Sequence, residues 1–271
     1  MEQPPRIIAS YPKSGRTWVR YMLHTYLRCL DGEYTAAVDG IDDRFRRYRI
    51  SFEHFASDPN RWHFELNIPD VGSSKLDRCV MIRRNVFEVL TSYFYESRFR
   101  QPSFGFRSTP HEFLRHPKLG VLKLAMYSNA WAHVVAPNLS DELRLAYHEM
   151  RADCTASMRR LVAFLGLRLD EKALAFAVEA GGFDRMRNAT RNAEHLTFSP
   201  RNVDDERTYK VRRSDPHECL ELFAEADLDF IEATLDAALT SEAKAIFGDC
   251  LHRPARQHTE AVYAAGSGSS L

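Results

Sequence analysis

Hydrophobic and polar positions change period along the chain, from short apolar runs to helix-spaced apolar positions. Residues 6–11 (RIIASY) form an apolar run of the length expected for a buried strand. Residues 16–30 then place apolar side chains at helical spacing, at Trp18, Tyr21, Met22, Tyr26 and Leu30. Because a Pro-Lys-Ser-Gly turn separates the two segments, the pattern predicts a strand, a loop and a helix.

The same order occurs twice more. Strand and helix are predicted at 79–82 and 86–98, and again at 143–147 and 154–165. Repeated strand-then-helix order is typical of a parallel sheet with helices on both faces. We therefore predict an α/β fold of three layers, in which a central parallel sheet is flanked by helices.

The remaining segments are less regular. The pattern favours a further strand at 62–66 and a long helix at 121–135, and it predicts long loops at 31–60, 101–118 and 188–207. Loops of this length are often lids or binding loops, although surface insertions without function are an equal alternative. We expect one domain over residues 1–256 and a flexible tail over 257–271, which ends in AAGSGSSL.

Composition restricts the class of protein. The chain has 271 residues, 44% of them hydrophobic, and its 37 basic side chains balance 37 acidic ones. A formal net charge of zero argues against a nucleic-acid partner, which usually requires a basic excess. Five scattered cysteines argue against a disulfide framework, and no apolar run reaches the length of a signal peptide or membrane span. We expect a soluble cytoplasmic protein, and a homodimer stays open.

The first candidate for chemistry is the turn between the first predicted strand and helix. Backbone N–H groups and the positive end of a helix dipole favour an anion there. The turn adds a charge, two hydroxyls and a flexible backbone through Lys13, Ser14, Thr17 and Gly15. The pattern of a nucleotide triphosphatase would need glycine at Ser10 and lysine at Arg16. On these residues alone, an anion site and an ordinary capped turn are equal alternatives.

A second candidate follows the next predicted strand. Arg84 stands at the strand end and Ser92 follows on the predicted helix. Two helical turns bring a guanidinium and a hydroxyl within reach of one group. The alternative is an exposed arginine and an ordinary helical serine, but two such strand ends in one sheet favour a ligand with two separated anionic ends.

The motifs together resemble the sulfotransferase family that uses 3'-phosphoadenosine 5'-phosphosulfate (PAPS). The resemblance is carried by YPKSGRTW at 11–18, RNVFEVLTS at 84–92, AYHEMRAD at 146–153 and LVAFLGL at 161–167, and it extends to about residue 213. It implies a P-loop-like nucleotide-binding fold. It also implies transfer of a sulfuryl group from PAPS to a small-molecule hydroxyl, an alcohol or a phenol, which leaves 3'-phosphoadenosine 5'-phosphate (PAP).

The resemblance also implies roles for individual residues. Lys13 is expected at the transferring sulfuryl group, and the 5' end is expected against the backbone of Ser14, Gly15, Arg16, Thr17 and Trp18. Arg84 and Ser92 are expected at the 3'-phosphate, together with the loop of Arg212, Arg213 and Ser214. The adenine is expected beside Trp18, Tyr147, Phe183 and Met186, although such side chains also fill cores.

Three positions depart from the family pattern. Gly181-Gly182-Phe183 stands where the family has Thr-Ser-Phe, so a threonine contact to adenine is missing. Arg212-Arg213-Ser214 replaces Arg-Lys-Gly, which keeps the charge but loses the flexibility of glycine. Arg16 replaces a threonine and either adds a charge beside the transferring group or points to solvent.

Transfer to a hydroxyl requires a base, and histidine titrates in the useful range. His63 resembles the family's base in its position before Arg84, with His148 and His54 as the next candidates. The catalytic residues are thus expected to be His63, Lys13 and Ser92. No metal is expected, because cationic side chains can neutralise the leaving group. The alternatives are a P-loop kinase that acts on a nucleotide or small molecule, and a PAP- or PAPS-binding protein without turnover.

Overall fold

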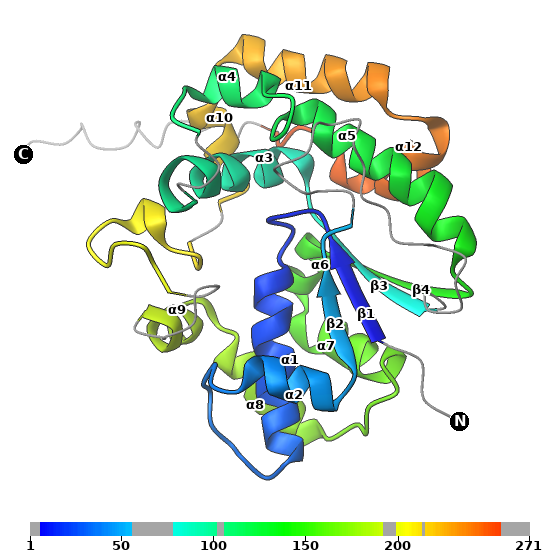
Figure 1. Cartoon of the computed structure of the whole chain (residues 1–271), viewed down its shortest axis with the longest axis vertical. Helices are drawn as coiled ribbons and strands as arrows, with labels where there is room; N and C mark the ends of the chain where they lie inside the picture. The colour runs from blue at the N-terminus through cyan, green and yellow to red at the C-terminus, as the bar shows by residue number, and fades with distance from the viewer. Residues whose placement is uncertain (1–5, 56–77, 102–105, 192–198, 213–214, 256–271) are drawn as a thin grey trace, which may run out of the picture.

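A computed structural model describes residues 6–55, 78–101, 106–191, 199–212 and 215–255. Within them, one parallel sheet has the strand order β2-β1-β3-β4 (Figure 1). Its strands are β1 (Arg6–Ser10), β2 (Ile50–Glu53), β3 (Arg78–Arg83) and β4 (Asp141–Ala146). The predicted α/β class with a central parallel sheet is confirmed.

Helices follow the strands and cover both faces of this sheet. They are α1 (Arg16–Leu30), α2 (Ile41–Arg47), α3 (Val86–Tyr95), α4 (Pro110–Arg115), α5 (Val121–Ala130), α6 (Tyr147–Ala152), α7 (Cys154–Phe164), α8 (Glu171–Ala180), α9 (Phe183–Arg191), α10 (Glu218–Leu222), α11 (Glu225–Ala238) and α12 (Ser241–Phe247). Two π-helical turns, Glu96–Arg100 and Trp131–Val135, continue α3 and α5.

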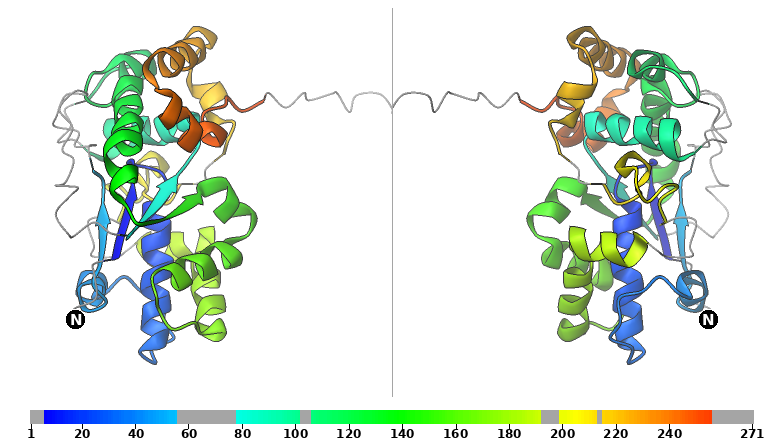
Figure 2. Two further views of the ribbon diagram at one scale, coloured as in Figure 1. Left: turned by 90° about the vertical axis from the view of Figure 1, so that its right-hand side faces the viewer. Right: turned by 90° about the vertical axis from the view of Figure 1, so that its left-hand side faces the viewer.

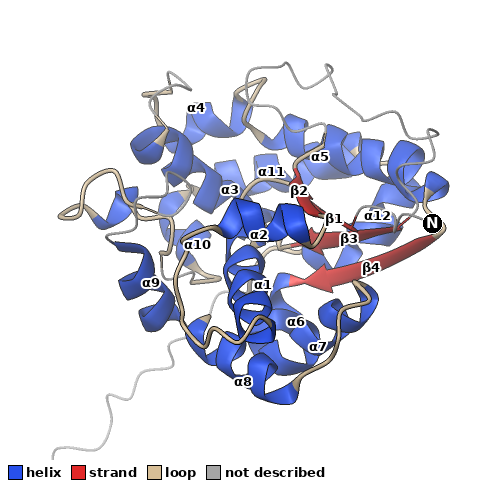
Figure 3. Cartoon of the chain, turned by 60° about the horizontal axis from the view of Figure 1, so that its bottom comes forward, coloured by secondary structure: helices blue, strands red, loops and turns tan. Residues whose placement is uncertain are grey.

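The alternation of side chains along β1 creates two cores. Because successive strand residues point to opposite faces, Ile7 and Ile8 enter different cores. The core that contains Ile7 is shared with α3, α5 and α11, and the core that contains Ile8 is shared with α1, α7 and α8. Figures 2 and 3 show the sheet between these two helical layers.

Several expected boundaries are confirmed and others are wrong. The helix at 16–30 is observed as predicted, and the one at 121–135 is present as α5 and its π-helical turn. The expected loop at 31–60 contains α2 and β2, and the loop at 101–118 contains α4, whose Thr109 and Glu112 form a capping box.

Short elements explain these errors, because four to seven residues carry too little periodicity to be recognised. Tyr147 begins α6 and does not end β4, and the expected loop at 188–207 starts within α9. The strand expected at 62–66 and the tail at 257–271 lie outside the described residues. The single domain over 1–256 stays a prediction.

The parallel arrangement gathers the carboxyl ends of the four strands at one edge of the sheet. The segments that follow these ends begin with Tyr11 after β1, His54 after β2, Arg84 after β3 and Tyr147 after β4. Ligands of open α/β sheets bind at this edge. No helix in the described part of the chain is both long and apolar enough to span a bilayer.

Candidate active site

The loop between β1 and α1 has an unusual backbone. Lys13 (φ 70°) and Gly15 (φ 102°) are both left-handed, and the N–H of Ser14 donates to the carbonyl of Tyr11 at 3.3 Å. Gly15 is the N-cap of α1 and supplies no side chain to cap it. No side chain therefore caps the backbone N–H groups in the first turn of this 15-residue helix. Such uncapped N–H groups at a helix N-terminus favour a bound anion.

Tyr147 connects this loop to the end of β4. A Cβ added at Gly15 would lie 2.6 Å from Cδ2 of Tyr147, so only glycine lets the ring pack on the loop. The guanidinium of Arg84 lies over the same ring, 4.3 Å from its centre. Nη1 of Arg84 also donates to the carbonyl of Lys13 at 2.9 Å. Three of the four sequence motifs thus meet at one place, those at 11–18, 84–92 and 146–153.

One face of α3 extends from this junction. Glu88, Ser92 and Glu96 follow one another at four-residue intervals, so they lie along the same side of the helix. Glu88 forms a buried ion pair with Arg84, with Nη2 and Oε2 2.9 Å apart. Glu96 forms another with Lys13, with Nζ and Oε2 also 2.9 Å apart. Ser92 stands between Glu88 and Glu96 on this face, and its expected role at the 3'-phosphate stays a prediction.

The environment of Lys13 changes its titration. Burial lowers the pKa of Lys13 to about 7, although Glu96 acts in the opposite direction. Burial alone would raise the pKa of Glu96, but the charges of Lys13, Lys210 and Arg100 hold it well below its usual value. Lys210 lies 3.1 Å from the second oxygen of the Glu96 carboxylate. Glu96 is therefore ionised and binds two lysines at once.

His54 lies at the carboxyl end of β2, beside the loop. Its Nδ1 is 2.9 Å from the carbonyl oxygen of Ser10, and its Nε2 is 2.5 Å from Nη2 of Arg16. Nδ1 must therefore carry the proton, and Nε2 accepts from Arg16. Burial and the charge of Arg16 lower the pKa of His54 to about 3. The imidazole is neutral near pH 7, and Arg16 points to it rather than to solvent.

Trp18 and Gly181 explain one departure from the family pattern. The indole Nε1 of Trp18 donates to the carbonyl of Gly181 at 2.8 Å, and its ring meets Tyr147 edge-on at 5.7 Å. A Cβ at Gly181 would lie 2.4 Å from Cγ of Met22. A threonine at this position would require the buried side chain of Met22 to shift, so the missing hydroxyl accompanies close packing against α1.

The other expected site residues have different surroundings. Phe183 is half-buried at the start of α9, and Met186 is buried in the core shared with α1. Arg212 pairs with Glu218 and lies 3.6 Å from the centre of the Tyr95 ring. His63, Arg213 and Ser214 lie outside the described residues, so their expected roles stay predictions.

A comparison with protein families decides the relationship of this chain. The family described as "Sulfotransferase domain" matches residues 3–240. The chain belongs to the sulfotransferase family. The luciferin sulfotransferase of Photinus pyralis is 24% identical over 219 residues, which are 67% of this chain and 56% of that protein. This sulfotransferase chain thus spans little more than half the length of that relative.

Solved structures share the fold of this sulfotransferase. A mouse sulfotransferase, SULT7A1, complexed with PAP has a TM-score of 0.61 and 16% identity, covering 92% of this chain and 88% of that one. A retinol dehydratase in complex with androsterone and inactive cofactor PAP has a TM-score of 0.58 and 16% identity, covering 89% of this chain and 82% of that one. The predicted P-loop-like architecture is confirmed by this likeness.

Two charged residues of the candidate site are not predicted by the sequence motifs. Glu96 and Lys210 belong to none of the motifs, yet Glu96 pairs with Lys13, and Lys210 pairs with Glu96. Glu96 could have been found, because it lies one helical turn after Ser92 on the same face of α3. Lys210 has no such local signal, since it is 114 positions from Glu96.

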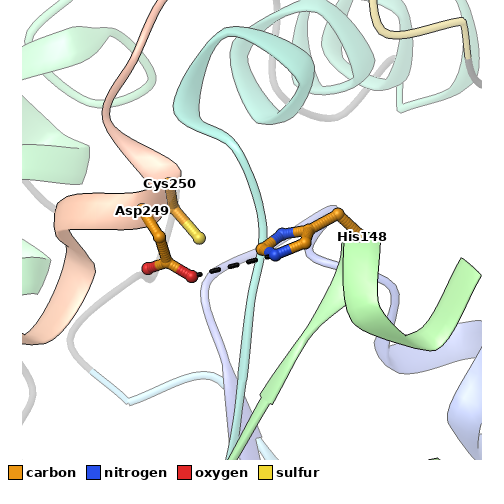
Figure 4. A group of neighbouring side chains, drawn as sticks. All are labelled: His148, Asp249 and Cys250. Carbon is orange, nitrogen blue, oxygen red and sulfur yellow. Dashed lines mark ion pairs between the residues drawn. The ribbon is translucent and has the colours of Figure 1, made fainter. Parts of the chain in front are cut away.

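One group of described residues in this sulfotransferase could offer three metal ligands, His148, Asp249 and Cys250. Figure 4 shows the imidazole of His148 facing the other two side chains, with its Nε2 3.9 Å from Asp249. Asp249 already pairs with Arg83 at 2.6 Å, and burial raises the pKa of the Cys250 thiol to about 12. An occupied carboxylate and a protonated thiol are poor ligands, so we assign no metal to this group.

Proposed function

We propose that this sulfotransferase moves a sulfuryl group from PAPS to the hydroxyl of a small-molecule alcohol or phenol and releases PAP. The observation that carries the proposal is the 2.9 Å hydrogen bond from Arg84 to the carbonyl of Lys13. It brings the two anion-ready strand ends together, as a ligand with a 5' and a 3' anionic group requires. The PAP named with the mouse sulfotransferase and the retinol dehydratase supports the same nucleotide.

In the proposed reaction, the bond from sulfur to the bridging oxygen of PAPS breaks, and a bond from sulfur to the acceptor oxygen forms. Charge develops on the bridging oxygen, so positioning and electrostatics dominate catalysis. The ammonium of Lys13 neutralises this charge, while the N-terminus of α1 holds the 5'-phosphate. Arg84 and Ser92 bind the 3'-phosphate, and the adenine lies against Trp18 and Phe183.

The proton of the acceptor hydroxyl needs a base. His63 stays the residue that the sequence predicts for this role. Among the described histidines we assign it to His54, which contacts Ser10 and Arg16 on the two sides of the loop. Its Nδ1–H is fixed by a carbonyl, so Nε2 is the nitrogen able to take the proton. Arg16 donates to Nε2 and, after burial, is the main cause of the low pKa of His54. The sulfonate oxygens of PAPS offer Arg16 a charged partner, and its movement to them frees Nε2 and brings the pKa of His54 closer to the range of a general base.

The alternatives from the sequence give different requirements. A P-loop kinase would transfer phosphate from ATP and need magnesium. A nucleotide-binding protein without turnover would bind PAP tightly and modify no acceptor. The cytoplasmic location, the lack of a nucleic-acid partner and a homodimer stay predictions.

The test is transfer of labelled sulfate from PAPS to a panel of phenols and alcohols in excess chelator. We expect a sulfate ester and PAP, and an affinity for PAPS about a hundredfold above that for adenosine 5'-phosphosulfate, since two charge-assisted hydrogen bonds are lost with the 3'-phosphate. Arg84→Ala should remove this preference, and Arg159→Ala, on the exposed side of α7, should keep it.

Equal affinity of the parent protein for the two nucleotides would contradict the assigned 3'-phosphate site. Activity that appears only with ATP and magnesium would establish a kinase. Tight PAP binding with no product from any acceptor would establish a binding protein.

A further inference from the structure

Glu96 is a buried acidic residue to which the proposed reaction assigns no role. It is 6% exposed and stands where α3 changes to its π-helical turn. A buried carboxylate is costly unless cations and hydrogen bonds compensate it. Three cations do so here: Lys13 at 2.9 Å, Lys210 at 3.1 Å and Arg100 at 3.9 Å.

The two oxygens of Glu96 pair with lysines from two different segments of the chain. Oε2 pairs with Lys13 in the loop after β1, and Oε1 pairs with Lys210. Lys210 lies two positions before Arg212, the residue expected at the 3'-phosphate. One carboxylate therefore connects the loop of the transferring group to the segment that leads into Arg212.

Without Glu96, the same cations would face one another in a partly buried region. Lys13 is 10% exposed and Lys210 is 17% exposed. Lys210 and Arg100 both disfavour a charge on Lys13, as does burial, and Glu96 is the group that favours it. Arg84 donates to the backbone carbonyl of Lys13. The charge that Lys13 brings to the sulfuryl group thus depends on Glu96.

We propose that Glu96 is a positioning residue, which holds Lys13 charged and oriented for the transfer and ties the segment of Lys210 to it. This inference rests on the proposed function, since it gives Lys13 its role at the leaving oxygen. Glu96 acts through the two lysines and contacts no reacting atom.

The experiment compares Glu96→Gln with Lys210→Met. Glutamine keeps the size of Glu96 but removes its charge, so Lys13 should titrate at lower pH than in the parent. Methionine removes a neighbouring cation, so Lys13 should titrate at higher pH. The titration is followed by NMR of labelled lysine in the ligand-free protein, where only seven lysines contribute and Lys13→Arg assigns the signal.

Asp227→Asn provides the matched control. Asp227 is also a buried carboxylate with cationic partners, Arg115 and His111, but it lies on α11 away from the loop. Its loss should leave the titration of Lys13 unchanged. In the transfer assay, Glu96→Gln should lower kcat/KM for PAPS about tenfold or more at pH 7.5, and the basic limb of its pH profile should move to lower pH.

An unchanged titration of Lys13 in Glu96→Gln, or a shift in the same direction in both variants, would overturn the inference. If Glu96→Gln does not fold, Glu96→Asp takes its place. Aspartate keeps the charge but is one methylene shorter, so it withdraws from Lys13, and Lys13 should again titrate at lower pH than in the parent. The two proposals can also fail separately. If the two variants shift the titration of Lys13 in opposite directions but the parent protein transfers no sulfate, the effect of Glu96 on Lys13 is supported and the proposed function is refuted.

Discussion

Gly15 and Gly181 stand where any side chain would collide with a neighbour. A Cβ at Gly15 would collide with the ring of Tyr147, and a Cβ at Gly181 would collide with the side chain of Met22 and lie close to that of Trp18. Gly15 also has a φ of 102°, which side chains rarely adopt. The first glycine keeps the loop open to an anion, and the second joins Trp18 to the start of α9. Glycine at each of these two positions therefore has a local steric reason.

At this scale, the assignment of the base can be tested with alanine variants. His54→Ala should reduce kcat by about a hundredfold to ten-thousandfold, the usual loss for a general base, while the Kd for PAP stays within a few-fold. His148→Ala serves as the control, since its half-exposed ring faces Asp249 rather than the loop. Steady-state kinetics and calorimetry supply the two measurements.

His63→Ala completes the comparison, because the sequence predicts that residue as the base. If His63→Ala shows the large loss and His54→Ala does not, the assignment to His54 is wrong and the sequence prediction holds.

Among the elements, α3 carries most of the charged site. Its N-cap, Asn85, accepts hydrogen bonds from the N–H groups of Phe87 and Glu88. The amide of Asn85 also donates to the carbonyl of His252 at 2.7 Å. Asn85 thus caps the first turn of α3 and also holds it to the segment of His252. This fixes the helix face that presents Glu88, Ser92 and Glu96.

Removal of this cap should affect both stability and binding. Asn85→Ala should lower the free energy of unfolding by about 1 kcal/mol, the usual cost of an N-cap, and should weaken PAP binding because Arg84 and Glu88 flank the cap. Urea denaturation and calorimetry measure the two effects.

Asp170→Ala is the matched cap variant. Asp170 caps α8 through the N–H of Ala173, on a helix that contributes none of the proposed PAP contacts. It should lose similar stability and keep its affinity for PAP. Equal loss of affinity in both variants would mean that Asn85 acts only through general stability.

In the whole molecule, the core shared with α1 encloses a histidine whose protonation is unfavourable. His24 is fully buried on α1, and burial together with Arg44 and Arg28 lowers its pKa to about 4. Its unfolded value is about 6.5, so the folded state binds fewer protons between these values. The contribution of His24 to stability is complete above about pH 6.5 and is lost as the pH falls toward 4.

We therefore expect the free energy of unfolding to fall by on the order of 3 kcal/mol from this group between pH 6.5 and 4. His24→Leu should flatten that part of the pH dependence, because leucine binds no proton. His133→Leu, at a half-exposed position, should leave it as in the parent. Urea denaturation at several pH values gives the measurement, and an identical slope in His24→Leu and the parent would refute the role of His24.

The sequence by itself determined the three strand-helix units and the two anion-ready strand ends. Each is a local pattern: apolar runs and helical spacing over 6–30, a glycine turn before a helix, and Arg84 directly after a strand. Short-range periodicity and turn chemistry are enough for such features, because they depend on residues a few positions apart. The short elements α2, β2 and α4 lack that periodicity and were missed.

Only the tertiary structure decided which side chains act on one another at the site. Arg16 and His54 are 38 positions apart, Lys13 and Glu96 are 83 apart, and Glu96 and Lys210 are 114 apart. No local pattern encodes such pairs. They arise because parallel strands bring their carboxyl ends to one edge of the sheet, where burial removes water and makes each neighbouring charge effective.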